Sequence, residues 1–309
     1  MDKKGLEMNF AWIFGIIVGA VILVLALYAT TGLVKTEDKI SETKTATQLG
    51  ILINPLETGL EEASYAKITL PVETQIYNKC RDVGNFGKQI LSVNERKGLG
   101  DTTSRGEEIS FFNKYIFSKS IEEGKKLHLI IKPLEMPYKV ADMVFLSADD
   151  YCFVNPFSEI EDELGDLNPE HIFQVDSLSD CPSGSRSVCF GNEDCEIMVN
   201  PISKIVTKNG ETVYYEDSLI YGAIFADKEI YECQVKRLMK RNAELAYLYL
   251  EKSRFLSGKG CSSNLELDLE EFIGLLNFGE EEDSYKLSQI SSSSGALKNK
   301  NDLLTCELF

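Results

Sequence analysis

The sequence is poor in the residues that most enzymes use for catalysis. Its 309 residues include two histidines, His128 and His171, and one tryptophan. It contains no Gly-x-Ser-x-Gly nucleophile motif and no Cys-x-x-Cys pair, so it lacks the signals of an α/β-hydrolase and of a common zinc site. We therefore predict no catalytic residues, cofactor or metal. Whether the chain is an enzyme stays open, with a structural or binding role favoured.

Positive charge is also scarce. The chain has 32 lysines and arginines against 49 acidic residues, a formal net charge of −17. A protein this acidic repels nucleic acids and anionic lipid headgroups, so nucleic-acid binding is excluded as a main role.

Charge of either sign is missing from Met8 to Val34, where Ile, Val, Leu, Ala and Gly dominate. About 20 such residues cross a bilayer core as a helix, and a cleaved secretory signal has a shorter apolar region. We expect a short cytoplasmic N-terminus over residues 1–9 and a single membrane-spanning helix over 10–34. The lipid bilayer is then the first partner of this protein.

Cysteines orient the predicted span, because lysines occur on both sides of it. The even number and wide spacing of the cysteines are typical of disulfides formed in an oxidising compartment, so we place everything after the span outside the cell membrane. All eight lie beyond residue 34: Cys80, Cys152, Cys181, Cys189, Cys195, Cys233, Cys261 and Cys306.

Local spacing favours two of the disulfide pairs. Cys189 and Cys195 flank a short polar turn that a bridge would close. A helix from Cys233 to about Leu256 would hold Cys233 and Cys261 roughly 40 Å apart, and a disulfide needs Cα atoms about 4.4–6.8 Å apart. We therefore pair Cys261 with Cys306 and expect a distant partner for Cys233.

The chain beyond the span reads as an α+β protein. Residues 35–64 continue as a helical stalk or linker, 65–226 form a β-rich region, and 227–309 form a helical region that packs on it. Alternating apolar residues predict a strand around Ile68–Ile76 with Pro71 on its outer face, and Asn209-Gly210 predicts a two-residue hairpin turn. A helix is expected from Ser158, capped through Glu161.

Small residues recur every four positions in the predicted span, at Ala11, Gly15 and Gly19. This small-xxx-small spacing lets two helices in lipid approach closely, so the span can also carry self-association. A basic cluster of Lys236, Arg237, Lys240 and Arg241 has two interpretations: charge balance within the acidic domain, or docking of an acidic neighbour.

The opening residues resemble a known class of export signals. Two lysines, Gly5 and a hydrophobic helix that runs into a stalk are similar to the class III signal of archaeal type IV pilin-like proteins. The first 35–50 residues also resemble uncharacterised archaeal single-span proteins. In pilin-like proteins a peptidase cuts after the glycine, here Gly5, and the helices bundle into a filament. Glu7 departs from the archaeal pattern, which has an apolar or small residue there.

These observations favour a membrane-anchored, extracytoplasmic structural or interaction protein of the cell envelope, with other envelope proteins or copies of itself as partners. Two alternatives remain open. One is a pilin-like subunit processed after Gly5, and the other is an anchored extracytoplasmic hydrolase.

Overall fold

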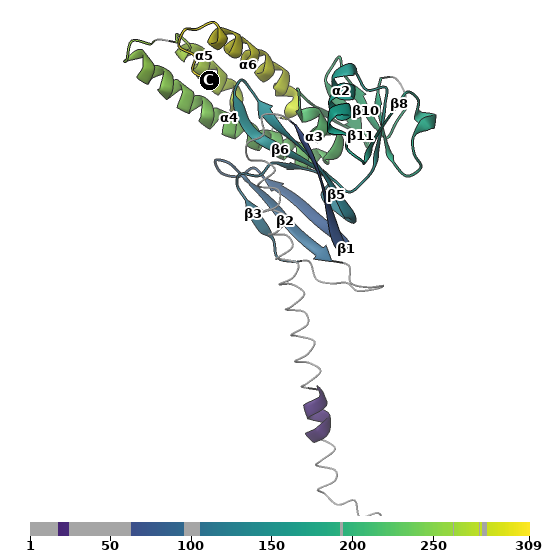
Figure 1. Ribbon diagram of the computed structural model, residues 1–309. Helices are drawn as coiled ribbons and strands as arrows, with labels where there is room; N and C mark the ends of the chain where they lie inside the picture. Colours follow the sequence, from purple (N-terminus) through teal and green to yellow (C-terminus); the bar gives the residue numbers. More distant parts are fainter. Residues whose placement is uncertain are drawn as a thin grey trace, which may run out of the picture.

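The computed structural model describes residues 18–24, 63–95, 106–191, 194–261, 263–277, 279 and 283–309 (Figure 1). Residues 18–24 are helical, and the other ranges form a mixed α+β structure. None of the helices in these ranges is long and apolar enough to cross a membrane. Most of the span predicted over 10–34 lies outside the described residues, as does most of the stalk predicted over 35–64.

Strands in the described ranges form two six-stranded sheets. Sheet A has the order β3-β2-β1-β5-β6-β4, and sheet B has the order β12-β11-β10-β9-β7-β8. The strands of sheet A are β1 (Ser64–Arg81), β2 (Lys88–Glu95), β3 (Ile109–Phe111), β4 (Ile116–Phe117), β5 (Ile121–Glu135) and β6 (Lys139–Ser147). Those of sheet B are β7 (Tyr151–Val154), β8 (Ile172–Val175), β9 (Arg186–Phe190), β10 (Ile197–Asn200), β11 (Ile205–Lys208) and β12 (Glu211–Tyr214).

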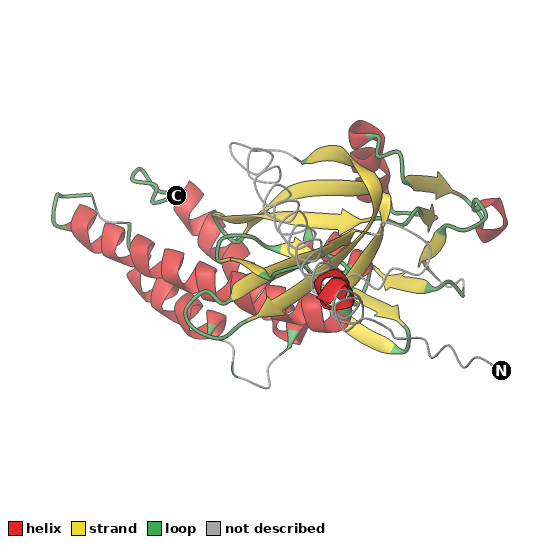
Figure 2. Cartoon of the chain, turned by 90° about the horizontal axis from the view of Figure 1, so that it is seen from below, coloured by secondary structure: helices red, strands yellow, loops and turns green. Residues whose placement is uncertain are grey.

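Helices gather on one side of sheet A, and the later ones form an arm that extends from it (Figures 1 and 2). The α-helices are α2 (Ser158–Leu167), α3 (Leu219–Phe225), α4 (Lys228–Ser257), α5 (Glu266–Leu276) and α6 (Leu287–Asp302), and the 3-10 turns are η1 (Leu178–Asp180) and η2 (Ser284–Lys286).

The predicted strand and hairpin are both present, and Pro71 is exposed, as predicted for the outer face of the strand. β1 lies between β2 and β5 in sheet A, but its pairing with β2 begins at Thr74, so the part of the strand before Thr74 pairs with β5 alone among the described strands. Its ladder with β5 is interrupted between Thr69 and Thr74, which accommodates a residue that has no N–H to donate. The hairpin turn joins β11 to β12, with positive φ angles of 52° at Asn209 and 74° at Gly210.

The capping box predicted for the helix at Ser158 does not form. α2 begins there, but its N-cap is Phe157 and no side chain caps it. The Ser158 hydroxyl donates to Glu159 instead. The helix ends at Leu167, because Asn168 adopts a left-handed conformation with φ 45°.

Both faces of sheet A are apolar, and the sheet is strongly curved (Figure 2). Alternation along β5 sends Leu127, Leu129 and Ile131 into a cluster on one face, whereas Ile130 and Leu134 join the main core on the other. That main core continues through α3, α4 and the inner side of sheet B.

A buried arginine on α4 organises the loops of sheet A. The Arg237 side chain is 0% exposed, and its guanidinium donates to the carbonyl oxygens of Phe86 (3.0 Å), Phe112 (3.0 Å) and Lys114 (2.8 Å). It also lies 4.7 Å from the centre of the Tyr115 ring. Burial lowers the pKa of Arg237 to about 10, so it stays charged at neutral pH.

Two further members of the basic cluster behave similarly. Arg241 donates to the carbonyl of Val140 at 2.7 Å, and Lys240 donates to the carbonyl of Asp82. These cations bind backbone carbonyls at the ends of loops. For Arg237, Lys240 and Arg241 this corrects both sequence interpretations, because their donors bind backbone carbonyls of this chain.

All eight cysteines are paired in four disulfides. The structure joins Cys189 to Cys195 and Cys261 to Cys306, the two pairs favoured by spacing. The remaining bridges join Cys80 to Cys233, which links β1 to α4, and Cys152 to Cys181.

Loop length predicts which bridge stabilises the fold most. Cys80 and Cys233 are 153 residues apart in the sequence, whereas Cys189 and Cys195 are 6 residues apart. In the chain-entropy description, replacing both cysteines by alanine costs about 4–5 kcal/mol for the long loop and about 2 kcal/mol for the short one. Denaturant unfolding of the two double variants measures this difference, and equal losses would contradict it.

Candidate functional site

Two adjoining cavities open between sheet A, α2 and the connection from β12 to α3. Their volumes are about 580 and 670 Å³, and both are lined by Lys132, Glu163, Asp217 and Ser218. Pockets of this size are typical of small-molecule and side-chain binding sites. We refer to the two together as the double cavity.

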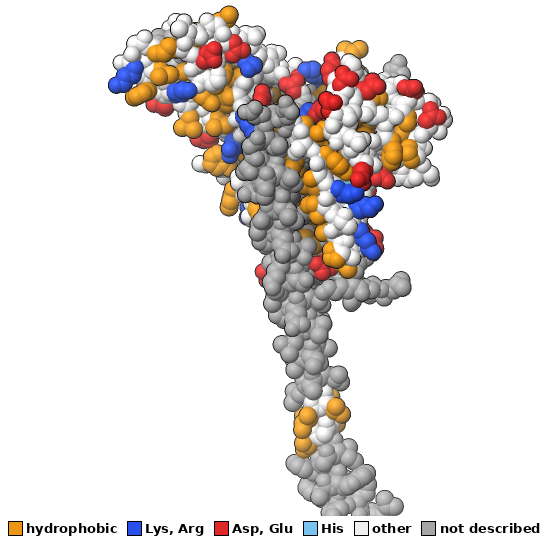
Figure 3. Space-filling view, viewed as in Figure 1, with side chains coloured by type: hydrophobic (Ala, Val, Ile, Leu, Met, Phe, Trp, Pro, Cys, Tyr) orange, Lys and Arg blue, Asp and Glu red, His pale blue; other side chains and the backbone are white. Residues whose placement is uncertain are grey.

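The cavity wall from α2 follows from the amphipathic pattern of that helix. Ile160 and Leu164 are buried, which directs Glu159 and Glu163, four residues apart, to a common neighbouring face. Acidic side chains gather over the surface at α2 (Figure 3). This spacing of acids is a signal that the sequence already contained.

A partly buried ion pair forms the part that the two cavities share. The Lys132 ammonium lies 2.5 Å from Glu163, and the other Glu163 oxygen accepts a hydrogen bond from the Tyr221 hydroxyl at 3.0 Å. The ammonium is also 5.1 Å from the centre of the Tyr221 ring. Burial, with the nearby Glu163 charge, raises the pKa of Tyr221, so its hydroxyl remains a neutral donor.

The rim of the double cavity carries unneutralised negative charge. Its second lysine, Lys204, is paired with Glu216. By contrast, no hydrogen bond or ion pair to the side chain is found in the described ranges for three carboxylates at the rim: Glu135, Asp166 and Asp217. Both cations are thus occupied and three anions are free, which favours a positively charged ligand group.

Aromatic side chains supply the apolar part of the wall. Phe157, Tyr215 and Tyr221 line the smaller cavity with Ile160 and Ile220. Aromatic faces beside carboxylates attract ammonium and guanidinium groups. Neither histidine lines the cavity, and Ser218 donates to the carbonyl of Pro133 at 3.4 Å rather than to a base. The arrangement supports binding and offers no nucleophile paired with a base.

The two histidines lie together, away from the double cavity. The His128 and His171 rings stack with centres 4.2 Å apart, and the Tyr65 hydroxyl is 2.7 Å from Nδ1 of His128. Nδ1 of His171 is buried and has no hydrogen-bond partner among the described residues. Burial lowers the pKa of both rings, to about 3 for His171, so the pair is neutral at pH 7.

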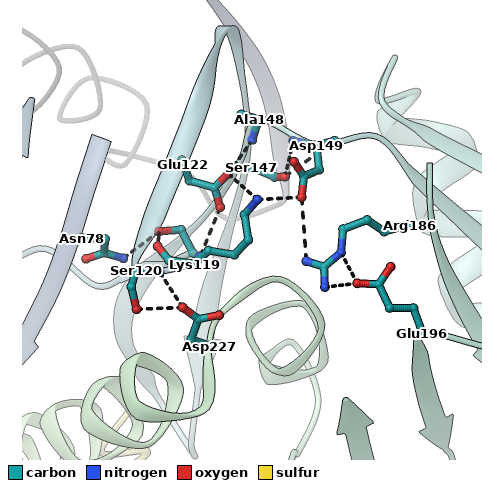
Figure 4. Close-up of polar contacts among 11 residues, drawn as sticks. Asn78, Lys119, Ser120, Glu122, Ser147, Ala148, Asp149, Arg186, Glu196 and Asp227 are labelled. Carbon is teal, nitrogen blue, oxygen red and sulfur yellow. Dashed lines mark hydrogen bonds and ion pairs between the residues drawn. The ribbon is translucent and has the colours of Figure 1, made fainter. Parts of the chain in front are cut away.

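A polar junction connects sheet A, sheet B and the start of α4 (Figure 4). Lys119 lies between the carboxylates of Glu122 and Asp149, at 3.6 and 2.7 Å. Arg186 on β9 approaches Asp149 at 3.8 Å and is held by Glu196 at 2.7 Å.

The junction also carries a buried acid. The Glu122 side chain is 0% exposed, and its oxygens accept hydrogen bonds from the backbone N–H groups of Lys119 (3.1 Å) and Ala148 (3.0 Å). Burial raises the pKa of Glu122 to about 7, although the Lys119 charge opposes that rise.

The other residues singled out in the sequence have separate places. Gly19 is in the helical segment 18–24, whereas Gly5, Ala11 and Gly15 lie outside the described residues. The cysteines stabilise the fold and do not line the double cavity. Over the ranges that the structure describes, there is no group of three or more His, Cys, Asp or Glu that could hold a metal ion.

Protonation of His171 is expected to destabilise the fold below neutral pH. Its folded-state pKa of about 3 lies below the value of about 6.5 in an unfolded chain, so the unfolded state binds the proton first. The free energy of unfolding therefore falls as pH drops through 6.5, by up to about 1.4 kcal/mol per pH unit.

Denaturant unfolding at pH 7 and pH 5 tests this with wild-type protein and His171→Gln. The variant should lose less stability between the two pH values. Glu122, with its raised pKa, contributes a change of opposite sign in both proteins and cancels in the comparison. An identical change in both proteins would contradict the prediction.

Comparison of the chain with protein-family models, with curated proteins and with solved structures finds no match. Evidence about function therefore comes from the chain's own geometry. The double cavity is the part of that geometry best suited to hold a ligand.

Proposed function

We propose that this protein is a membrane-anchored, extracytoplasmic interaction protein of the cell envelope. Residues 10–34 would span the membrane once, with the N-terminus in the cytoplasm and the disulfide-bonded domain outside. The observation that carries this proposal is the pairing of all eight cysteines in four disulfides. Structural disulfides persist in oxidising compartments and are rare in the cytosol.

The double cavity is the binding site in this proposal. Its occupied lysines, free carboxylates and aromatic wall favour a basic group presented by a partner in the envelope. The hydrolase alternative has no support at this site, since its lining offers no nucleophile in contact with a base.

Topology is tested in intact cells that express the full chain. An added protease should digest the domain from outside, and a thiol reagent should label no cysteine until a reductant is added. A protected domain with reactive thiols would overturn the proposal. The mass of the N-terminal peptide from the same cells separates a permanent anchor from a pilin-like subunit, because processing would remove the residues up to Gly5.

Binding through the double cavity is tested with tetralysine as the probe. The double variant Asp166→Lys/Asp217→Lys should weaken binding by about tenfold or more, because it reverses two free charges at the rim. A matched control, Asp176→Lys/Glu211→Lys, makes the same change in net charge at exposed acids that do not line the cavity. Equal weakening by both variants would show general attraction to an acidic protein and reject the site.

A further inference from the structure

We propose that the polar junction forms a covalent cross-link, an amide bond between Nζ of Lys119 and the side-chain carboxyl carbon of Asp149, with Glu122 transferring the proton. The junction contains the required parts at contact distance: an amine, a carboxyl group to receive it and a buried acid beside both. This inference is independent of the double cavity and of its ligand.

The reacting groups are already close to the geometry of attack. Nζ of Lys119 is 2.7 Å from Oδ2 of Asp149. A nitrogen hydrogen-bonded to a carboxylate lies about 3–3.5 Å from its carbon, which is the distance of a near-attack arrangement; rotation of the carboxyl group then aligns the carbon for attack. Figure 4 shows the lysine side chain reaching between the two carboxylates.

The backbone on both sides of the pair is held in place. Ser120, next to Lys119, donates through its N–H and its hydroxyl to Asp227 at 2.7 Å, and its carbonyl accepts from Asn78 at 2.9 Å. The N–H of Asp149 donates to the Ser147 hydroxyl at 2.9 Å. Little conformational freedom is left to lose when the bond forms.

β5 approaches the end of β6 closely, which brings Lys119, just before β5, near Asp149, just after β6. A Cβ atom at Gly124 would lie 3.2 Å from Cβ of Ala148, a contact so tight that one of the two segments would have to shift by a few tenths of an ångström. The N–H of Ala148 then reaches Glu122, which sets the carboxyl group beside the Lys119 ammonium.

The reaction balances without a further reagent. Ionised Glu122 takes a proton from the Lys119 ammonium, and the neutral amine attacks the carboxyl carbon of Asp149. Protonated Glu122 then returns that proton to the departing oxygen, which takes up a second proton from the nitrogen and leaves as water. One ammonium and one carboxylate become one amide and one water molecule.

Three features of the junction favour this step. A buried acid whose pKa is about 7 gives up and takes back a proton readily at neutral pH. The Arg186 guanidinium, 3.8 Å from the reacting Asp149 oxygen, is placed to stabilise negative charge that develops there. Lys119 and Asp149 are 26% and 30% exposed, which gives the departing water a route out.

Peptide mapping of the full chain tests the cross-link. The protein is reduced, alkylated and digested with trypsin after incubation at pH 7. We expect a linked product containing Lys119 and Asp149, uncut after Lys119 and lighter than its two peptides by one water molecule. Separate peptides of full mass, with cleavage after Lys119, would overturn the proposal, as would a link through a different lysine.

Variants distinguish loss of the cross-linking reaction from loss of folding. Lys119→Arg keeps the positive charge but offers no nucleophilic amine, so the linked product should disappear. Glu122→Gln should slow its formation by about 10²–10⁴-fold. If Glu122→Gln does not fold, Lys119→Arg still decides the assignment. Lys67→Arg is the matched control, because Lys67 forms a 2.6 Å ion pair with Glu170 on an exposed surface, and the link should persist there.

Discussion

Burial of the Arg237 guanidinium is the constraint on which the rest of the described structure depends. A charged group removed from water is costly unless its donors are satisfied, and here backbone carbonyls of two loops satisfy them. The loop around Phe86 and the segment around Phe112 and Lys114 must therefore end at α4. Sheet A is held against this helix at its loops as well as through its apolar face.

Other contacts of α4 also hold it against sheet A. The Cys80–Cys233 bridge ties its first turns to β1, and Asp227, just before the helix, accepts two hydrogen bonds from Ser120. Because Ser120 precedes β5, the start of α4 also positions the junction where β5, β6 and sheet B meet. The double cavity lies beyond that junction, where α2 and the start of α3 come against the far end of β5.

Local elements of this fold could be predicted because their physical causes are local. Alternation of apolar residues identifies β1, Asn209-Gly210 determines the β11–β12 turn, and helical rise separates Cys233 from Cys261. The outward position of Pro71 also follows from this alternation, whereas the interruption of its ladder with β5 is visible only in the sheet. The partners of Arg237, Lys240 and Arg241 could not be predicted, because they are backbone carbonyls, which every residue has and no composition reveals.

The sequence by itself determined the acidity of the chain, the charge-free stretch near its start, the α+β class and the residues available for chemistry. The tertiary structure alone decided which of those residues meet. The rings of His128 and His171 stack although the residues are 43 positions apart. Asp149 and Asp150 are adjacent in sequence, yet Asp149 pairs with Lys119 whereas the charge of Asp150 acts on His128. The double cavity also depends on contacts between β5, α2 and α3. Hydrophobic periodicity and residue spacing describe neighbours along the chain, whereas cavities and buried charges arise from packing between distant segments.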